Sequence, residues 1–153
     1  MPLRWLIVGL IAGTLSVLIF HQPAVALLQA LALTPRAPYS MEATAPFGVP
    51  QVWSAAFWGG LWGIALAASL ARPRGAALIA GATVFGAILP TLVTWFVVAP
   101  LKGQLVAAGF VPLAMLVSPI VNAAWGLGTG IGLELFGRSH AAHERRPHAT
   151  TGP

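Results

Sequence analysis

Polar residues that lie inside otherwise apolar stretches are the ones with which this sequence could do chemistry: His21, Gln22, Ser54 and Asn122. A polar group in apolar surroundings is costly without a partner, so each is a functional hypothesis by default. A histidine there could hold a proton or a small solute, and amide and hydroxyl groups could line the same space. We predict that these residues form a candidate polar pocket that opens outward. The alternative is a histidine that only stabilises the fold. A metal or haem site is disfavoured, because such a site would need a second ligand.

Other apparent motifs do not meet the requirements of their chemistry. The run from His143 to His148 has one residue too many for the zinc motif H-E-x-x-H, and Pro147 would break the helix that this motif needs. The glycine-rich run from Gly126 to Gly132 lacks the spacing and the preceding strand of a nucleotide-binding loop. No Ser/His/Asp set and no buried pair of carboxylates is evident. The sequence therefore predicts no enzyme, no cofactor and no metal site.

The elements that must position the polar residues are long apolar stretches. Of the 153 residues, 58% are hydrophobic and only 7% are charged, which is more apolar surface than a soluble domain of this size could bury. Each stretch approaches or exceeds the ~20 residues that a membrane-spanning helix needs. The predicted spans cover residues 5–33, 52–71, 76–99 and 117–136. We predict an all-α integral membrane protein with a transmembrane domain over residues 1–138.

Basic residues flank the predicted spans unevenly. Most lie beside the two termini or between the second and third spans: Arg4, Arg72, Arg74, Arg138, Arg145 and Arg146. Only Arg36 and Lys102 lie on the other side. The positive-inside rule then places both termini in the cytoplasm, with residues 139–153 as a disordered basic tail. Because the charges orient helices rather than form one patch, the net charge of +5 does not indicate nucleic acid binding.

The N-terminus also has the features of a secretory signal peptide. A charged start, an apolar core over residues 5–20 and the small residues Ala24 and Ala26 are typical of one. Cleavage after Ala26 would leave the apolar run of residues 27–33 as a new N-terminus, and it would remove a unit of an internal repeat. Whether residues 1–26 are removed stays open at the level of the sequence.

That internal repeat relates the two halves of the predicted domain. Residues 10–13 (Leu-Ile-Ala-Gly) recur at 78–81, and residues 54–57 (Ser-Ala-Ala-Phe) correspond at the same offset to Asn-Ala-Ala-Trp at 122–125. One offset thus aligns the first span with the third and the second with the fourth. We predict two similar helical hairpins in a parallel repeat, because each unit contains an even number of spans.

Prolines and tryptophans give further expectations for the helices. Pro23 and Pro90 should kink the first and third spans and leave the carbonyl groups of Ile19 and Gly86 without their helical donors. The tryptophans within the spans lie mostly toward the outer ends, as an aromatic belt would: Trp53, Trp58, Trp62, Trp95 and Trp125.

Glycines four residues apart predict faces at which helices touch. They let backbones approach closely where lipid provides no hydrophobic drive for association. The pairs are Gly9 with Gly13, Gly59 with Gly63, Gly126 with Gly130, and Gly128 with Gly132. In the fourth span one face carries Asn122, Gly126, Gly130, Glu134 and Arg138. This face is either a packing seam closed by a Glu134–Arg138 pair or the wall of a polar path.

Four short motifs carry a resemblance over about the first 65 residues. They are Phe20-His21-Gln22, Pro38-Tyr39-Ser40, Gly48-Val49-Pro50-Gln51 and the run Phe57-Trp58-Gly59-Gly60-Leu61-Trp62-Gly63. With them the chain resembles an uncharacterised family of small multi-pass proteobacterial inner-membrane proteins. The resemblance implies a bacterial inner membrane and no activity.

The sequence leaves two kinds of function. The first is a structural, assembly or accessory component that acts through helix packing, in contact with the lipid bilayer and with itself or another membrane protein. The alternative is a small transporter or channel subunit whose outward-facing polar pocket takes a small solute. The two differ in whether the outer polar residues line water or are buried against other helices.

Overall fold

The computed structural model describes the backbone of residues 3–72 and 74–144 and the side chains through Phe136. Its elements are α1 (Leu3–Ser16), η1 (Val17–His21), α2 (Gln22–Ala30), β1 (Ala43–Thr44), β2 (Val49–Pro50), α3 (Gln51–Ser69), α4 (Ala76–Val93), η2 (Thr94–Val98), α5 (Ala99–Leu101), η3 (Val106–Phe110) and α6 (Pro112–Glu144). The elements η1 and η2 are π-helical turns, and they join their neighbours into continuous helices.

Helices dominate the described residues, and four continuous helical segments are long and apolar enough to cross a membrane. They are Leu3–Ala30, Gln51–Ser69, Ala76–Leu101 and Pro112–Phe136. The predicted all-α fold with four such helices is therefore confirmed, and it fits a multi-pass membrane protein. The fourth helix begins at Pro112 rather than at residue 117, because a proline is well tolerated in the first turn of a helix.

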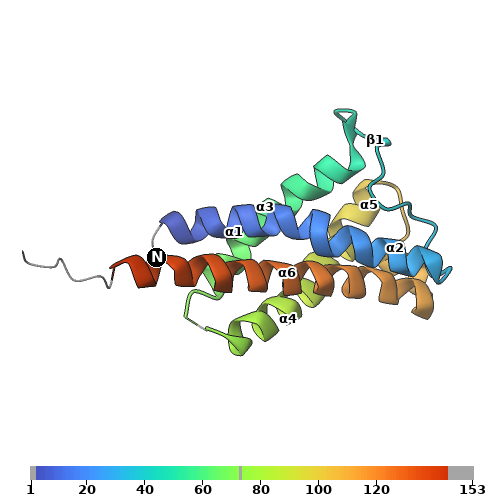
Figure 1. Ribbon diagram of the computed structural model, residues 1–153. Helices are drawn as coiled ribbons and strands as arrows, with labels where there is room; N and C mark the ends of the chain where they lie inside the picture. The colour runs from blue at the N-terminus through green and yellow to red at the C-terminus, as the bar shows by residue number, and fades with distance from the viewer. Residues whose placement is uncertain (1–2, 73, 145–153) are drawn as a thin grey trace, which may run out of the picture.

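The helices form a bundle in which α6 has the central place. α1 packs along α3, α4 packs along α6, and α1 also packs against α6, whereas α3 makes few contacts with α4 or α6. In Figure 1, α1 and α2 run beside α6 along most of its length, with α3 and α4 crossing at an angle. We call the end with the start of α1 and the C-terminal part of α6 the terminal end. The opposite end, with segments 31–50 and 102–111, is the loop end.

Backbone contact between α1 and α3 occurs at glycines. A Cβ atom added to Gly9 would lie 2.5 Å from the carbonyl oxygen of Gly63, and one added to Gly13 would collide with the carbonyl oxygen of Gly59. A side chain of any size on these faces would therefore separate the helices. Gly59 and Gly63, both predicted as packing residues, face α1.

The glycines of α6 contact two different helical segments. A Cβ atom on Gly126 would lie 3.2 Å from the Cα of Gly86, and one on Gly130 would lie 2.8 Å from the Cβ of Ala82, so both positions face α4. Gly128 instead faces the side chains of α1 and η1. Because alternate glycines point to opposite sides, α6 packs closely against both helix partners at once.

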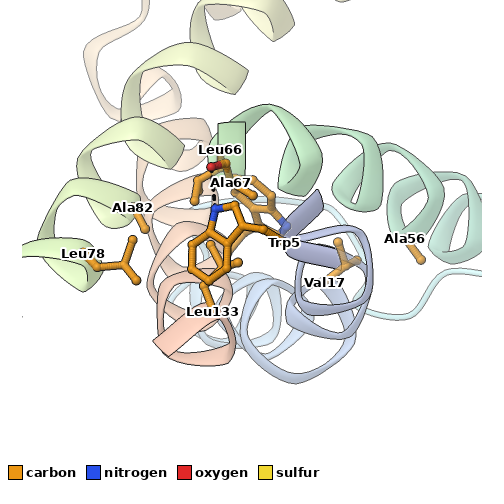
Figure 2. Close-up of a cluster of buried hydrophobic side chains, with 9 residues drawn as sticks. Trp5, Val17, Ala56, Leu66, Ala67, Leu78, Ala82 and Leu133 are labelled. Atoms are coloured by element: carbon orange, nitrogen blue, oxygen red, sulfur yellow. Dashed lines mark hydrogen bonds between the residues drawn. The ribbon is translucent and has the colours of Figure 1, made fainter. Parts of the chain in front are cut away.

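Buried side chains from all four helices fill the bundle toward the terminal end. The cluster comprises Trp5, Val17, Ala56, Leu66, Ala67, Leu78, Ala82, Trp125 and Leu133, most of them labelled in Figure 2. The indole N–H of Trp5 donates to the carbonyl oxygen of Ala67 at 2.7 Å, which is the dashed line in that figure. This bond ties the start of α1 to the end of α3.

Trp125 lies at the centre of the fold and not at a membrane surface. It is 3% exposed, and its indole N–H donates to the carbonyl oxygen of Gly13 at 3.0 Å. Its own carbonyl oxygen accepts the Ser16 hydroxyl at 2.6 Å. The expectation of an aromatic anchor is therefore wrong for Trp125. The glycine-rich face of α1 leaves room for the indole ring and offers its N–H an acceptor.

Pro23 is accommodated by the π-helical turn η1 rather than by a simple kink. The residue after η1 donates its N–H to the carbonyl oxygen of Val17, five residues earlier. In this register the carbonyl that faces the proline nitrogen is that of Leu18, and the Tyr39 hydroxyl donates to it at 2.7 Å. The carbonyl group that loses its helical donor is therefore that of Leu18 and not, as predicted, that of Ile19. The loop supplies a replacement donor, the Tyr39 hydroxyl.

Glu134 joins α6 to the start of α4 at the terminal end. It is 7% exposed, and its carboxylate accepts the N–H of Gly75, the residue before α4, at 2.8 Å. A carboxylate at a helix start pairs with unsatisfied N–H groups and with the positive end of the helix dipole. The side chain of Arg138, the predicted partner of Glu134, lies outside the described residues. The helical backbone of α6 continues to Glu144, and residues 145–153 of the predicted tail also lie outside the described part.

Candidate functional site

A cavity of about 90 Å³ lies at the loop end, between η1, α2, η2, α6 and the segment after α2. Its wall is formed by His21, Val25, Thr34, Arg36, Thr94, Val117, Ser118, Val121 and Asn122. The structure thus brings together two of the residues predicted for a polar pocket, His21 and Asn122. The other two, Gln22 and Ser54, do not line this cavity.

His21 lies at the end of η1 on the cavity wall. Its Nδ1 atom is buried and has no hydrogen-bond partner among the described residues. A buried nitrogen without a partner is destabilising unless water or a ligand meets it. His21 therefore combines a place on the cavity wall with a ring nitrogen that no described residue satisfies.

Asn122 stands where α6 and α4 meet. Its side-chain amide donates to the Thr91 hydroxyl at 2.9 Å, which fixes the orientation of the carboxamide. Its backbone carbonyl lies against Gly86, so the two helices approach closely at this residue of the cavity wall. Asn122 thus belongs both to the cavity wall and to a packing seam.

Gln22 stabilises the loop instead of lining the cavity. It is 6% exposed, and its side-chain carbonyl accepts the N–H of Tyr39 at 2.7 Å. The same tyrosine donates its hydroxyl to Leu18. These two bonds hold the loop over α2, so Gln22 acts on the site through the position of the chain between α2 and α3.

Ser54 lies half-buried in α3, away from the cavity. The sequence repeat pairs it with Asn122, but α3 packs on α1 and makes few contacts with α6. Equivalent positions in the two halves therefore do not converge on one axis. The pocket is built from α2, η2, α6 and the loop after α2.

Sequence reasoning missed four polar residues of the cavity wall: Thr34, Arg36, Thr94 and Ser118. Ser118 lies four residues before Asn122 and so shares its helix face, a spacing that could have identified it. Arg36 was used only as a marker of topology. Thr34 holds this segment in place, because its hydroxyl oxygen accepts the N–H of Arg36 at 3.3 Å.

The groups on the cavity wall suit hydrogen bonding to water or to a small solute. They comprise imidazole, guanidinium, carboxamide and hydroxyl side chains, with valines between them. In the part of the chain that the structure describes, no three His, Cys, Asp or Glu side chains gather to hold a metal ion. Comparisons of the chain with protein-family models, with curated proteins and with solved structures found no match.

Proposed function

We propose that the protein is a structural, assembly or accessory component of a bacterial inner membrane and acts through helix packing. The observation that carries the proposal is backbone contact at glycines in both principal helix pairs. Gly13 touches Gly59 between α1 and α3, and Gly86 touches Gly126 between α4 and α6. Such contacts stabilise helix association in lipid, where packing and hydrogen bonds replace the hydrophobic effect. The suggested origin of the chain in the bacterial inner membrane is part of the same proposal.

A small transporter or channel subunit is the second candidate, and the polar cavity is the observation that favours it. Conduction would require polar groups to continue toward the terminal end. Below the cavity the bundle is instead filled by fully buried side chains, among them Leu66, Leu78 and Leu133. Thr129 is also fully buried, and its hydroxyl bonds to the carbonyl oxygen of Trp125 at 2.9 Å. These contacts favour packing over transport.

The proposed architecture is a duplicated hairpin. α1 with α3 and α4 with α6 are the two closely packed pairs of consecutive spans. The contact of Gly13 with Gly59 has a counterpart in Ala82 with Gly126. The sequence repeat pairs Gly13 with Gly81 and Gly59 with Leu127. Ala82 lies one residue after Gly81, and Gly126 lies one residue before Leu127. A parallel repeat with a slightly rotated second unit accounts for this displacement.

The proposed topology places the loop end in the periplasm and both termini in the cytoplasm. Four spanning helices return the chain to the side on which it began. By the positive-inside rule, the uneven distribution of arginines then assigns that side to the cytoplasm. The cavity with His21 opens outward in this orientation.

Photo-crosslinking in the native membrane tests the packing function. A photoreactive amino acid would be placed at exposed positions on three helices, Trp58 in α3, Leu92 in α4 and Leu127 in α6. An accessory component should give a discrete adduct with a membrane protein, or with a second copy of itself, from at least one position and only after irradiation. Adducts with lipid alone from all three positions would contradict the proposal and leave the pocket as the site of function.

A further inference from the structure

Among the described residues, those that line the cavity at the loop end include a positive charge and no carboxylate. Among the described residues Arg36 is the charged side chain that lines it. Glu42 lies in the exposed segment just before β1, and Glu134 lies at the terminal end, bound to Gly75. Because the wall carries this positive charge and no described carboxylate beside it, the cavity favours an anion over a cation.

Hydrogen-bond donors surround the same space. Thr94 and Ser118 contribute hydroxyl groups from η2 and α6, and His21, whose Nδ1 has no partner among the described residues, contributes an imidazole from η1. Asn122 is held in place by its bond to Thr91. The wall therefore combines one cationic fork with several neutral groups that can each bind an oxygen atom.

We propose that this cavity binds a phosphate group. The planar guanidinium of Arg36 offers paired N–H donors whose spacing matches phosphate oxygens, and hydroxyl and imidazole donors complete such sites. One water molecule needs about 10–15 Å³. A volume of about 90 Å³ therefore has room for a small oxyanion.

The place of the cavity in the bundle gives two sources for the phosphate. The loop end of a membrane-spanning bundle lies at the level of the lipid headgroups, so a phospholipid can present its phosphate there. Free phosphate can enter from the water on the same side. Binding at this site goes beyond the packing role, because the glycine seams hold the helix pairs together and Arg36, Thr94 and Ser118 of the cavity wall do not belong to them.

Ligand titration of the purified protein tests the proposal. Protein in a neutral, phosphate-free detergent would be titrated with inorganic phosphate and, separately, with a short-chain phosphatidylglycerol. Intrinsic tryptophan fluorescence is the readout, since Trp95 adjoins Thr94 on the cavity wall. We expect saturable binding of at least one probe. R36Q should weaken that binding about tenfold or more, because it removes the charged fork.

Two further variants make the test specific. K102Q removes the other basic residue of the loop end, which does not line the cavity, and should change affinity by less than about twofold. S118A removes one hydroxyl from the wall and should weaken binding several-fold without changing the ligand-free melting temperature. It keeps the test informative if R36Q does not fold.

The outcomes separate the two sources and decide the proposal. Binding of the lipid alone identifies a headgroup site, and binding of inorganic phosphate identifies a free-anion site. The proposal is overturned if neither probe saturates, or if R36Q and K102Q weaken binding equally. Loss of the phosphate site would leave the crosslinking result unaffected, so failure of this inference is distinguishable from failure of the packing function.

Discussion

Gly13→Ala is expected to lower the free energy of unfolding by about 3 kcal/mol, the upper end of the cost of overpacking. The added Cβ atom would collide with the carbonyl oxygen of Gly59 and lie 2.9 Å from the Cα of Gly63. Both neighbours are backbone atoms, which cannot rotate away as a side chain can. α1 and α3 must then separate along the whole seam. Thermal or denaturant unfolding in detergent measures the loss.

Gly81→Ala is the matched control for this prediction. The sequence repeat pairs Gly81 with Gly13, yet a Cβ atom on Gly81 would meet only the end of the Leu70 side chain, at 3.4 Å. Alanine is favoured over glycine inside a helix by about 0.8–1.0 kcal/mol, so this variant should be as stable as the native protein or slightly more stable. Equal destabilisation by the two substitutions would mean that α1 and α3 do not pack as described.

Trp125→Ala is expected to cost about 3–5 kcal/mol, as for other large aromatic residues removed from a core. The indole ring is almost fully buried between α6 and α1, and its loss also removes the hydrogen bond from its N–H to the carbonyl oxygen of Gly13. Trp125→Phe keeps an aromatic ring but loses the N–H and part of the ring volume, so it should cost less than Trp125→Ala and more than the about 1 kcal/mol of a hydrogen bond alone. Both values follow from unfolding curves of the purified variants.

Trp58→Ala provides the control for a tryptophan on the outside of the bundle. Trp58 is 58% exposed and has only the edge-to-face contact with Phe57 as an aromatic neighbour. Its replacement should change the free energy of unfolding by less than about 0.5 kcal/mol. If Trp125→Ala and Trp58→Ala were equally mild, Trp125 would be an anchor at the membrane surface, as its sequence position suggests.

The spans and their glycine faces were predictable because they depend on local properties of the chain. Hydropathy over a helix-length window identifies a segment that can cross a membrane, whatever it packs against. A spacing of four residues places Gly126 and Gly130 on one helix face, whichever helix is the partner. The structure adds that the partner is α4, and that Gly128 between them serves α1.

Features that depend on the neighbouring helix could not be predicted in the same way. The Trp125 ring is central because it packs against a glycine-rich face of α1. The residues of that face are far from Trp125 in the sequence. Ser54 was expected in the pocket from its repeat partner, but the angle of α3 carries it elsewhere. Arg36 lines the cavity because of the way the loop folds, and no periodic pattern in the sequence predicts that fold.

A bundle that is closed toward the terminal end, with a cavity that opens only to the outside, separates the proposed packing role from transport. Thiol labelling in intact cells tests it directly, because the chain has no cysteine of its own and each introduced one is unique. T44C in the loop, S118C on the cavity wall and T129C in the core would be treated with a small, membrane-impermeant reagent from outside.

We expect labelling of T44C and S118C from outside, and of T129C only after denaturation, because Thr129 is fully buried. Labelling of T44C only after the membrane is opened would contradict the proposed topology. Labelling of T129C in intact cells would contradict the closed bundle, since it would show that water and the reagent reach past the cavity into the core.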